Sequence, residues 1–129
     1  MKTTLTFAIL IGLARLVMAS DQTVLGTFST GEDKYQFVLP AEFQNSHQWD
    51  GISAEIPLRQ EDAIKILQQA AQKDHGAIPP LRSIGLSQNY LTKIYHYQAD
   101  FILADVTDPK SNYILLMDGT VIRLTKKPK

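Results

Sequence analysis

Alternating apolar and polar residues mark two short segments in the first part of the chain. Residues 23–28 and 35–39 are rich in β-branched and aromatic side chains, and a polar stretch containing one glycine separates them. From Tyr35 to Leu39 every second side chain is aromatic or aliphatic, so these side chains share one face of a strand. The pattern predicts a β-hairpin, which Pro40 ends because proline has no amide hydrogen to donate.

A helical period of 3.6 is found over residues 60–74. The apolar positions recur at spacings of three and four, and they are Ala63, Ile64, Leu67, Ala70 and Ala71. Glu61 and Asp62 fall in the first turn, where negative charge favours the positive end of the helix dipole. Gly76 suits the left-handed position that follows a helix. The pattern predicts one amphipathic helix.

Strand-like alternation returns after the helix. The expected strands cover residues 81–88, 93–104, 113–117 and 120–125. In the longest of them one face holds Tyr95, Tyr97, Ala99, Phe101 and Leu103, and the other holds His96, Gln98 and Asp100. This alternation is typical of an antiparallel sheet with one buried and one wet face. Asp118-Gly119, between the last two strands, favours a tight hairpin turn with positive φ at both residues.

The order of these elements predicts an α+β fold. One main helix packs on a four-stranded antiparallel meander, and a β-hairpin precedes them at the N-terminus. Residues 41–51 are polar without a clear period and predict a loop or a short turn of helix, and residues 52–56 predict a brief strand. All these elements fit one domain over residues 20–129, a size that supports a packed core without covalent cross-links.

Residues 1–19 have the three regions of a secretory signal peptide. A lysine near the start is followed by a mostly apolar run over residues 5–14, and small residues lie around Ala19. We expect cleavage after Ala19 or, as the alternative, after Ser20. An uncleaved membrane anchor is the competing interpretation, but an anchor needs about 20 consecutive apolar residues and Arg15 interrupts the run.

Export to the periplasm or the medium therefore follows as a prediction, with no stable membrane span after cleavage. The chain has no cysteine, which excludes disulfides and thiolate metal sites. When Lys2 and Arg15 leave with the signal peptide, 11 of the 13 basic residues remain against 13 acidic ones, a formal charge of −2. That balance gives no reason to expect nucleic acid or an anionic membrane as the main partner.

Candidate functional residues are few, and none of them forms a catalytic or metal-binding motif. We therefore expect no catalytic residue, no metal and no cofactor. The side chains that could form a binding surface are His47, Trp49, Asp50, Tyr90, His96, Gln98 and Asp100. His96 and Asp100 lie about 13 Å apart along a strand, too far to share a proton or a metal. His75 follows the helix, where a capping role is expected.

Residues 58–124 resemble the small exported domains of the PepSY type. The resemblance rests on Glu61-Asp62-Ala63-Ile64 at the helix start, Ala70-Ala71 near its end, Leu81-Arg82-Ser83-Ile84-Gly85-Leu86, and Tyr113-Ile114-Leu115-Leu116-Met117-Asp118-Gly119-Thr120-Val121-Ile122. It implies a helix followed by strands that close on an Asp-Gly hairpin. It also implies a binding or inhibitory module without catalytic residues. The N-terminal hairpin and the loop around Trp49 have no counterpart in that pattern.

Two functions are compatible with these features, and a purely structural accessory role is a third possibility. The first is a non-enzymatic module that contacts a protein or peptide in the cell envelope through an exposed sheet edge or through the loops of Trp49 and Tyr90. The alternative is a small-ligand carrier or hydrolase with a pocket between helix and sheet. That pocket would be lined by Tyr95, Tyr97, Phe101 and His96, and it requires His96 to point towards the helix.

Overall fold

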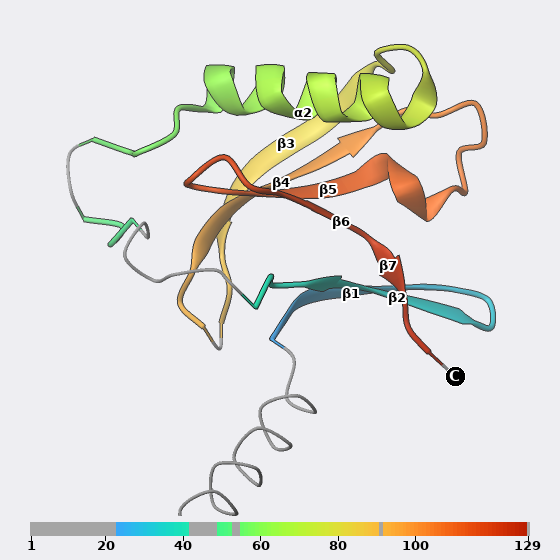
Figure 1. Cartoon of the computed structure of the whole chain (residues 1–129), viewed down its shortest axis with the longest axis horizontal. Helices are drawn as coiled ribbons and strands as arrows, with labels where there is room; N and C mark the ends of the chain where they lie inside the picture. The colour runs from blue at the N-terminus through green and yellow to red at the C-terminus, as the bar shows by residue number, and fades with distance from the viewer. Residues whose placement is uncertain (1–22, 42–48, 53–54, 91, 129) are drawn as a thin grey trace, which may run out of the picture.

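The computed structural model describes residues 23–41, 49–52, 55–90 and 92–128. They form three layers, in which the four-stranded sheet lies between a helix and a second sheet (Figure 1). The predicted α+β architecture, with a four-stranded antiparallel sheet and an N-terminal hairpin, is confirmed. No helix in the described part of the chain is long and apolar enough to cross a membrane. The predicted signal peptide lies outside the described residues.

The N-terminal hairpin consists of β1 (Val24–Thr30) and β2 (Asp33–Val38). Its turn is tighter than predicted, since Thr30 pairs with Asp33 and Gly31 adopts a φ of +56°. β7 (Thr125–Lys126) adds to β2, which gives a three-stranded sheet in the order β1-β2-β7. The chain segment predicted as one strand over residues 120–125 thus divides at Leu124 between two sheets.

The single described helix, α2 (Gln60–His75), agrees with the predicted helix to within one residue. Ala63, Leu67 and Ala71 are completely buried on its inner side. It ends because Gly76 takes up the left-handed conformation, φ 84°, and donates its amide hydrogen to the carbonyl of Gln72.

The second sheet has the order β3-β4-β5-β6, with all neighbours antiparallel. Its strands are β3 (Leu81–Gln88), β4 (Tyr95–Phe101), β5 (Asn112–Leu116) and β6 (Val121–Arg123), and the 3-10 turn η2 (Pro109–Ser111) precedes β5. A turn forms at Asp118-Gly119, but the prediction of positive φ at both residues is wrong. Leu116 donates its amide hydrogen to Thr120, so the loop is wider than a two-residue turn and only Gly119 has a positive φ. The brief strand predicted over residues 52–56 is wrong for Ile52, Glu55 and Ile56.

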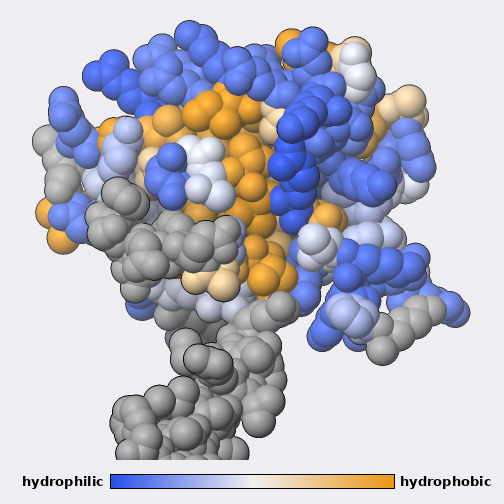
Figure 2. All heavy atoms as spheres, in the orientation of Figure 1, coloured by the Kyte–Doolittle hydropathy of each residue, from blue (hydrophilic) through white to orange (hydrophobic). Residues whose placement is uncertain are grey.

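Two apolar clusters hold the layers together. The first lies between α2 and the sheet and includes Leu67, Tyr97, Phe101 and Tyr113. The second lies on the opposite face, where β5 and β6 pack against Leu25 and Phe37 of the hairpin. Figure 2 shows apolar residues between α2 and the hairpin, with hydrophilic residues above them and on their right. Burial on both faces explains why β5 is continuously buried over its last four residues.

The prediction of a solvent-exposed face on β4 is wrong at His96, because the hairpin covers that end of the face. His96 points away from α2, as the alternation requires, but only 3% of it is exposed. It pairs with Leu116, which belongs to the cluster under the hairpin. Gln98 is exposed and Asp100 is half-buried. The hairpin thus covers the His96 end of this face and leaves the Gln98 end open.

Candidate functional site

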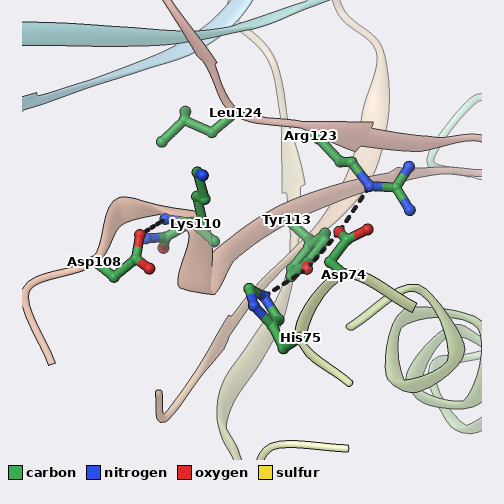
Figure 3. A pocket seen from close by; sticks show the side chains of 8 residues that line it. Asp74, His75, Asp108, Lys110, Tyr113, Arg123 and Leu124 are labelled. Carbon is green, nitrogen blue, oxygen red and sulfur yellow. Dashed lines mark hydrogen bonds and ion pairs between the residues drawn. The ribbon is translucent and has the colours of Figure 1, made fainter. Parts of the chain in front are cut away.

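A hydrogen-bonded group of polar side chains lies at the C-terminal end of α2 (Figure 3). Asp74 and His75 come from the last turn of α2, Tyr113 from β5 and Arg123 from β6. One carboxylate oxygen of Asp74, Oδ2, accepts from the Tyr113 hydroxyl at 2.8 Å and from Arg123 Nε at 2.8 Å. His75 Nε2 lies 3.1 Å from the same hydroxyl oxygen. The sequence pattern assigned no common role to these residues.

The hydrogen bonds in this group assign the proton on His75. A carboxylate can only accept, so the Tyr113 hydroxyl donates its hydrogen to Asp74. Its oxygen is then an acceptor, and His75 must donate through Nε2. His75 therefore binds a strand side chain, whereas the sequence suggested a helix cap. The result is a directed chain of hydrogen bonds from His75 through Tyr113 to Asp74.

The pKa values of two of these groups follow from the same contacts. Burial would raise the pKa of Asp74, but the hydrogen bonds from Arg123 and Tyr113 outweigh it and hold the pKa below the ordinary value. Burial and the hydrogen bond to Asp74 raise the pKa of the Tyr113 hydroxyl well above the ordinary value for tyrosine. Asp74 is therefore a charged acceptor and Tyr113 a neutral donor at neutral pH.

These side chains line part of a pocket of about 370 Å³. The remaining lining residues are Asp108, Lys110, Asn112 and Leu124, which come from η2 and from the ends of β5 and β6. Asp108 caps η2, since its Oδ1 accepts from the amide of Lys110 at 2.9 Å. In Figure 3 Lys110 and Leu124 lie on the side of the pocket opposite Asp74. Side chains of both charges thus surround one opening.

The residues predicted to form a binding surface do not come together in this pocket. His47 lies outside the described residues. Trp49 is half-buried against the helix-side cluster, and its ring meets the ring of Tyr95 edge to face at a centroid distance of 5.0 Å. Asp50 is exposed beside it and accepts from the amide of Ile52. Trp49 therefore anchors its loop to the domain.

Tyr90 is the most accessible aromatic side chain of the described residues, with 83% of its surface exposed. The ammonium of Lys93 lies 5.2 Å from the centre of its ring. Both residues belong to the loop between β3 and β4, which Asn89 ties to β1 by donating to the carbonyl of Leu25. Tyr90 is therefore presented on an anchored loop.

The polar residues of β4 have three different environments. His96 is buried, its Nδ1 has no hydrogen-bond partner, and burial lowers its pKa. Gln98 faces solvent. Asp100 forms an ion pair with Arg82 of β3, whose Nε donates over 2.7 Å. Since Tyr97 and Phe101 are 2% exposed, the helix side of β4 is filled core and not the predicted ligand pocket.

The outer edge of β3 is a second feature with functional potential. β3 is eight residues long and pairs with β4 on one side only, and no other described strand pairs with it. Six of its eight residues are exposed. In Figure 1 this edge lies at the far side of the sheet from β6. Open strand edges carry unpaired amide and carbonyl groups.

Metal ligation finds no support in the described ranges. No three side chains of the His, Asp or Glu type come close enough there to hold a metal ion. Asp105, one of the loop aspartates, accepts from the amide and hydroxyl of Thr107, which shows it forming a turn.

Comparisons with known proteins found no relative of this chain. No protein-family model, no curated protein and no solved structure matches the chain. The resemblance of residues 58–124 to PepSY-type domains therefore stays a prediction. The function has to be argued from the geometry of the pocket and of the β3 edge.

Proposed function

We propose that this domain is a non-enzymatic binding module that takes up an extended segment of another protein as an additional strand on β3. The observation that carries the proposal is the open edge of β3, which is eight residues long and unpaired within the described part of the chain. Strand addition draws its affinity from main-chain hydrogen bonds and needs no catalytic side chains.

The hairpin register indicates which main-chain groups are available. Asn89 donates its amide hydrogen to the carbonyl of Ile94, so these two residues form a hydrogen-bonded pair at the end of the ladder. Hydrogen-bonded and non-hydrogen-bonded pairs alternate in an antiparallel ladder. The amides and carbonyls of Ile84, Leu86 and Gln88 therefore point away from β4 towards the open edge.

The side chains of β3 define the chemistry of the partner. Ile84 and Leu86 pair with Ala99 and Tyr97 and thus share the helix-side face, where Leu86 is 41% exposed. The opposite face carries the small residues Ser83, Gly85 and Ser87. An added strand places alternate side chains on these two faces. We expect a partner segment in which apolar residues alternate with small polar ones.

Edge strands that avoid partners commonly carry lysine, proline or inward-pointing charge. From Ser83 to Gln88 β3 has no charged residue and no proline. Its one charge, Arg82, lies at the bulge near the start of the strand and is paired with Asp100. The exposed Tyr90 continues this edge into the loop and adds contact area for a partner. The central part of the edge is thus unprotected.

A selection experiment tests the proposal. A displayed library of random octapeptides is selected on the full chain, and the affinity of the enriched peptide is measured for the protein and for Leu86→Pro. Proline removes the outward amide at position 86 while the β4 ladder stays intact, so we expect affinity to fall at least about tenfold. Leu86→Val keeps the amide and should stay within about threefold.

Hydrogen exchange gives a readout that does not depend on a variant. Peptide binding should slow exchange at the amides of Ile84, Leu86 and Gln88, which face the open edge. Enriched peptides without alternation, or equal binding by Leu86→Pro and Leu86→Val, would contradict strand addition.

Export is part of the same proposal. The signal peptide pattern of residues 1–19 supports a role in the periplasm or outside the cell. Mass spectrometry of the protein expressed with its own N-terminus tests this directly. A mature chain that starts at Ser20 or Asp21 supports export, and an intact residue 1 in the membrane fraction contradicts it.

A further inference from the structure

We propose that β3 also pairs with β3 of a second copy of this chain, and that this self-pairing keeps the edge closed until a partner segment displaces the copy. The self-pairing rests on the function proposed above, because both occupants use the same open edge. It follows from the side-chain pattern of β3, from the direction of its free main-chain groups and from the place of α2 on the sheet.

The side-chain pattern of β3 is the one that its own edge requires of a partner. Ile84 and Leu86 lie on the helix-side face, and the small residues Gly85 and Ser87 lie on the opposite face. Apolar residues thus alternate with small ones, as we expect of an added strand. A second copy of the chain therefore supplies a segment that fits.

A two-fold axis at Leu86 satisfies the free main-chain groups. The amides and carbonyls of Ile84, Leu86 and Gln88 point towards the open edge. In an antiparallel ladder, two residues that exchange both hydrogen bonds lie directly opposite each other. With the axis at Leu86, this residue lies opposite its own copy and Ile84 lies opposite Gln88 of the second copy. All three residues are then paired.

Other positions of the axis pair fewer of these groups. With the axis at Gly85, Gln88 would lie opposite Arg82, where the bulge of β3 disrupts the ladder. With the axis at Ser87, Ile84 would lie opposite Tyr90, which is beyond the end of the strand. The register centred on Leu86 is therefore the one that we assign.

The side chains agree with this register. Leu86 is 41% exposed in the single chain. In the pair it meets its own copy across the axis and lies diagonal to Ile84. On the opposite face Gly85 meets Ser87, so two small residues lie together. A symmetric pair brings like charges close to each other, but β3 has no charged residue from Ser83 to Gln88.

The position of α2 leaves the edge accessible to a second sheet. The helix packs most closely on β4 and β5, and Figure 1 shows it above the sheet and not beside the β3 edge. Two copies can therefore meet edge to edge. Their four-stranded sheets then continue into one antiparallel sheet across a two-fold axis.

Self-pairing regulates strand addition, because a second copy and a partner segment need the same amides and carbonyls. Dilution frees the edge and a rise in protein concentration closes it. The closed edge is also protected from uncontrolled pairing with other chains.

Sedimentation of the full chain over a concentration series tests the self-pairing, and we expect a monomer–dimer equilibrium. Leu86→Lys places two ammonium groups opposite each other at the axis, and Leu86→Glu places two carboxylates there. Each variant alone should raise the dissociation constant of the dimer at least about tenfold. Mixed in equal amounts, the two variants should form a heterodimer, because opposite charges then face each other. This rescue also shows that both variants are folded.

Thr27→Lys is the matched control. Thr27 is an exposed residue of β1, the outer strand of the three-stranded sheet. Its substitution should leave the dissociation constant within about twofold. A chain that stays monomeric up to millimolar concentration, variants that form no heterodimer, or an equal loss in Thr27→Lys would overturn the proposal.

Single cysteines test the register, since the chain has no cysteine of its own. Leu86→Cys should give a disulfide-linked dimer on oxidation with diamide, because Cα atoms in a hydrogen-bonded pair lie about 5.5 Å apart, within the range of a disulfide. Ile84→Cys places its two sulfur atoms about 14 Å apart along the strands and should stay unlinked. The reverse result would contradict the register centred on Leu86.

Competition separates this inference from the function on which it rests. The octapeptide selected on the full chain should convert the dimer into peptide-bound monomers in the same sedimentation experiment. A chain that binds the peptide but never dimerises would overturn the self-pairing and leave strand addition standing. A chain that dimerises through Leu86 but binds no peptide would instead contradict the uptake of a partner segment.

Discussion

Tyr113 of β5 donates its hydroxyl hydrogen to Asp74 at the end of α2 over 2.8 Å, although 39 residues separate the two in the sequence. Arg123 of β6 donates to the same carboxylate, so the helix end is bonded to both strands of the β5-β6 hairpin. It therefore joins three elements at one oxygen atom. The same contact forms the inner wall of the pocket.

Loss of this hydroxyl should destabilise the domain. Tyr113→Phe keeps the buried ring but leaves Asp74 with one donor fewer, and hydrogen bonds to charged groups contribute about 1.5–3 kcal/mol. We expect the free energy of unfolding in urea at pH 7 to fall by about 1–3 kcal/mol. Tyr90→Phe, at an exposed position, should change it by less than about 0.5 kcal/mol. Similar effects for both variants would contradict the assignment.

The charge of Asp74 should make part of the stability depend on pH. Its hydrogen bonds hold the folded-state pKa below the ordinary value of 3.8, so the folded protein binds fewer protons than the unfolded chain in acid. The stabilisation is present above pH 3.8 and is lost as the pH falls through the folded-state pKa.

Asp74→Asn should therefore be less stable than the unmodified protein at pH 6, and the difference should shrink at pH 3. Chemical denaturation at a series of pH values measures both. The variant Asp118→Asn removes a carboxylate from an exposed turn and should leave the acid dependence of the Asp74 contact in place. A difference between Asp74→Asn and the unmodified protein that stays constant from pH 6 to pH 3 would rule out this origin.

Local signals were sufficient to predict α2 and most of the strands. The helix boundaries follow from a period of 3.6 and from Gly76, and both are contained within neighbouring residues. The passage of the chain from β6 to β7 could not be predicted, because Leu124 looks like any other residue of an alternating strand. Only the position of the hairpin in space determines that Thr125 and Lys126 pair with β2.

The pocket escaped prediction for a related reason. The sequence pattern explains each of these residues within its own element: Asp74 at a helix end, Tyr113 on a strand face and Arg123 at a strand end. Tyr113 and Arg123 donate to the same oxygen atom of Asp74 only because of how α2 crosses β5 and β6. The predicted exposure of His96 is wrong for the same reason. Alternation shows on which face of a strand a side chain lies, but not what covers that face.

Buried His96 should give the domain a second dependence on pH. Burial lowers its folded-state pKa below the ordinary value of 6.5, against an opposing backbone hydrogen bond with Ile94. The unfolded chain then binds a proton more readily, so stability falls as the pH drops below 6.5. His96→Leu also removes the unpaired Nδ1 atom and should flatten this part of the stability curve.

Urea denaturation between pH 7.5 and pH 5 measures the slope of the free energy of unfolding against pH. His75→Gln keeps His96 and should keep the slope. A His96→Leu variant that loses stability on acidification as steeply as the unmodified protein would show that another group is responsible.

Gly51 fixes the position of the only tryptophan in the chain. Its φ is +79°, and a Cβ atom there would lie 2.3 Å from the hydroxyl of Tyr95, whose ring packs against Trp49. Gly51→Ala should therefore separate the two rings and destabilise the domain by about 1–3 kcal/mol. Gly85→Ala is the matched control, because its Cβ would meet no atom within 4 Å.

Fluorescence of Trp49 reports the change directly: we expect a red shift in Gly51→Ala and none in Gly85→Ala. An unchanged spectrum and unchanged stability in Gly51→Ala would mean that the loop is not held by this contact.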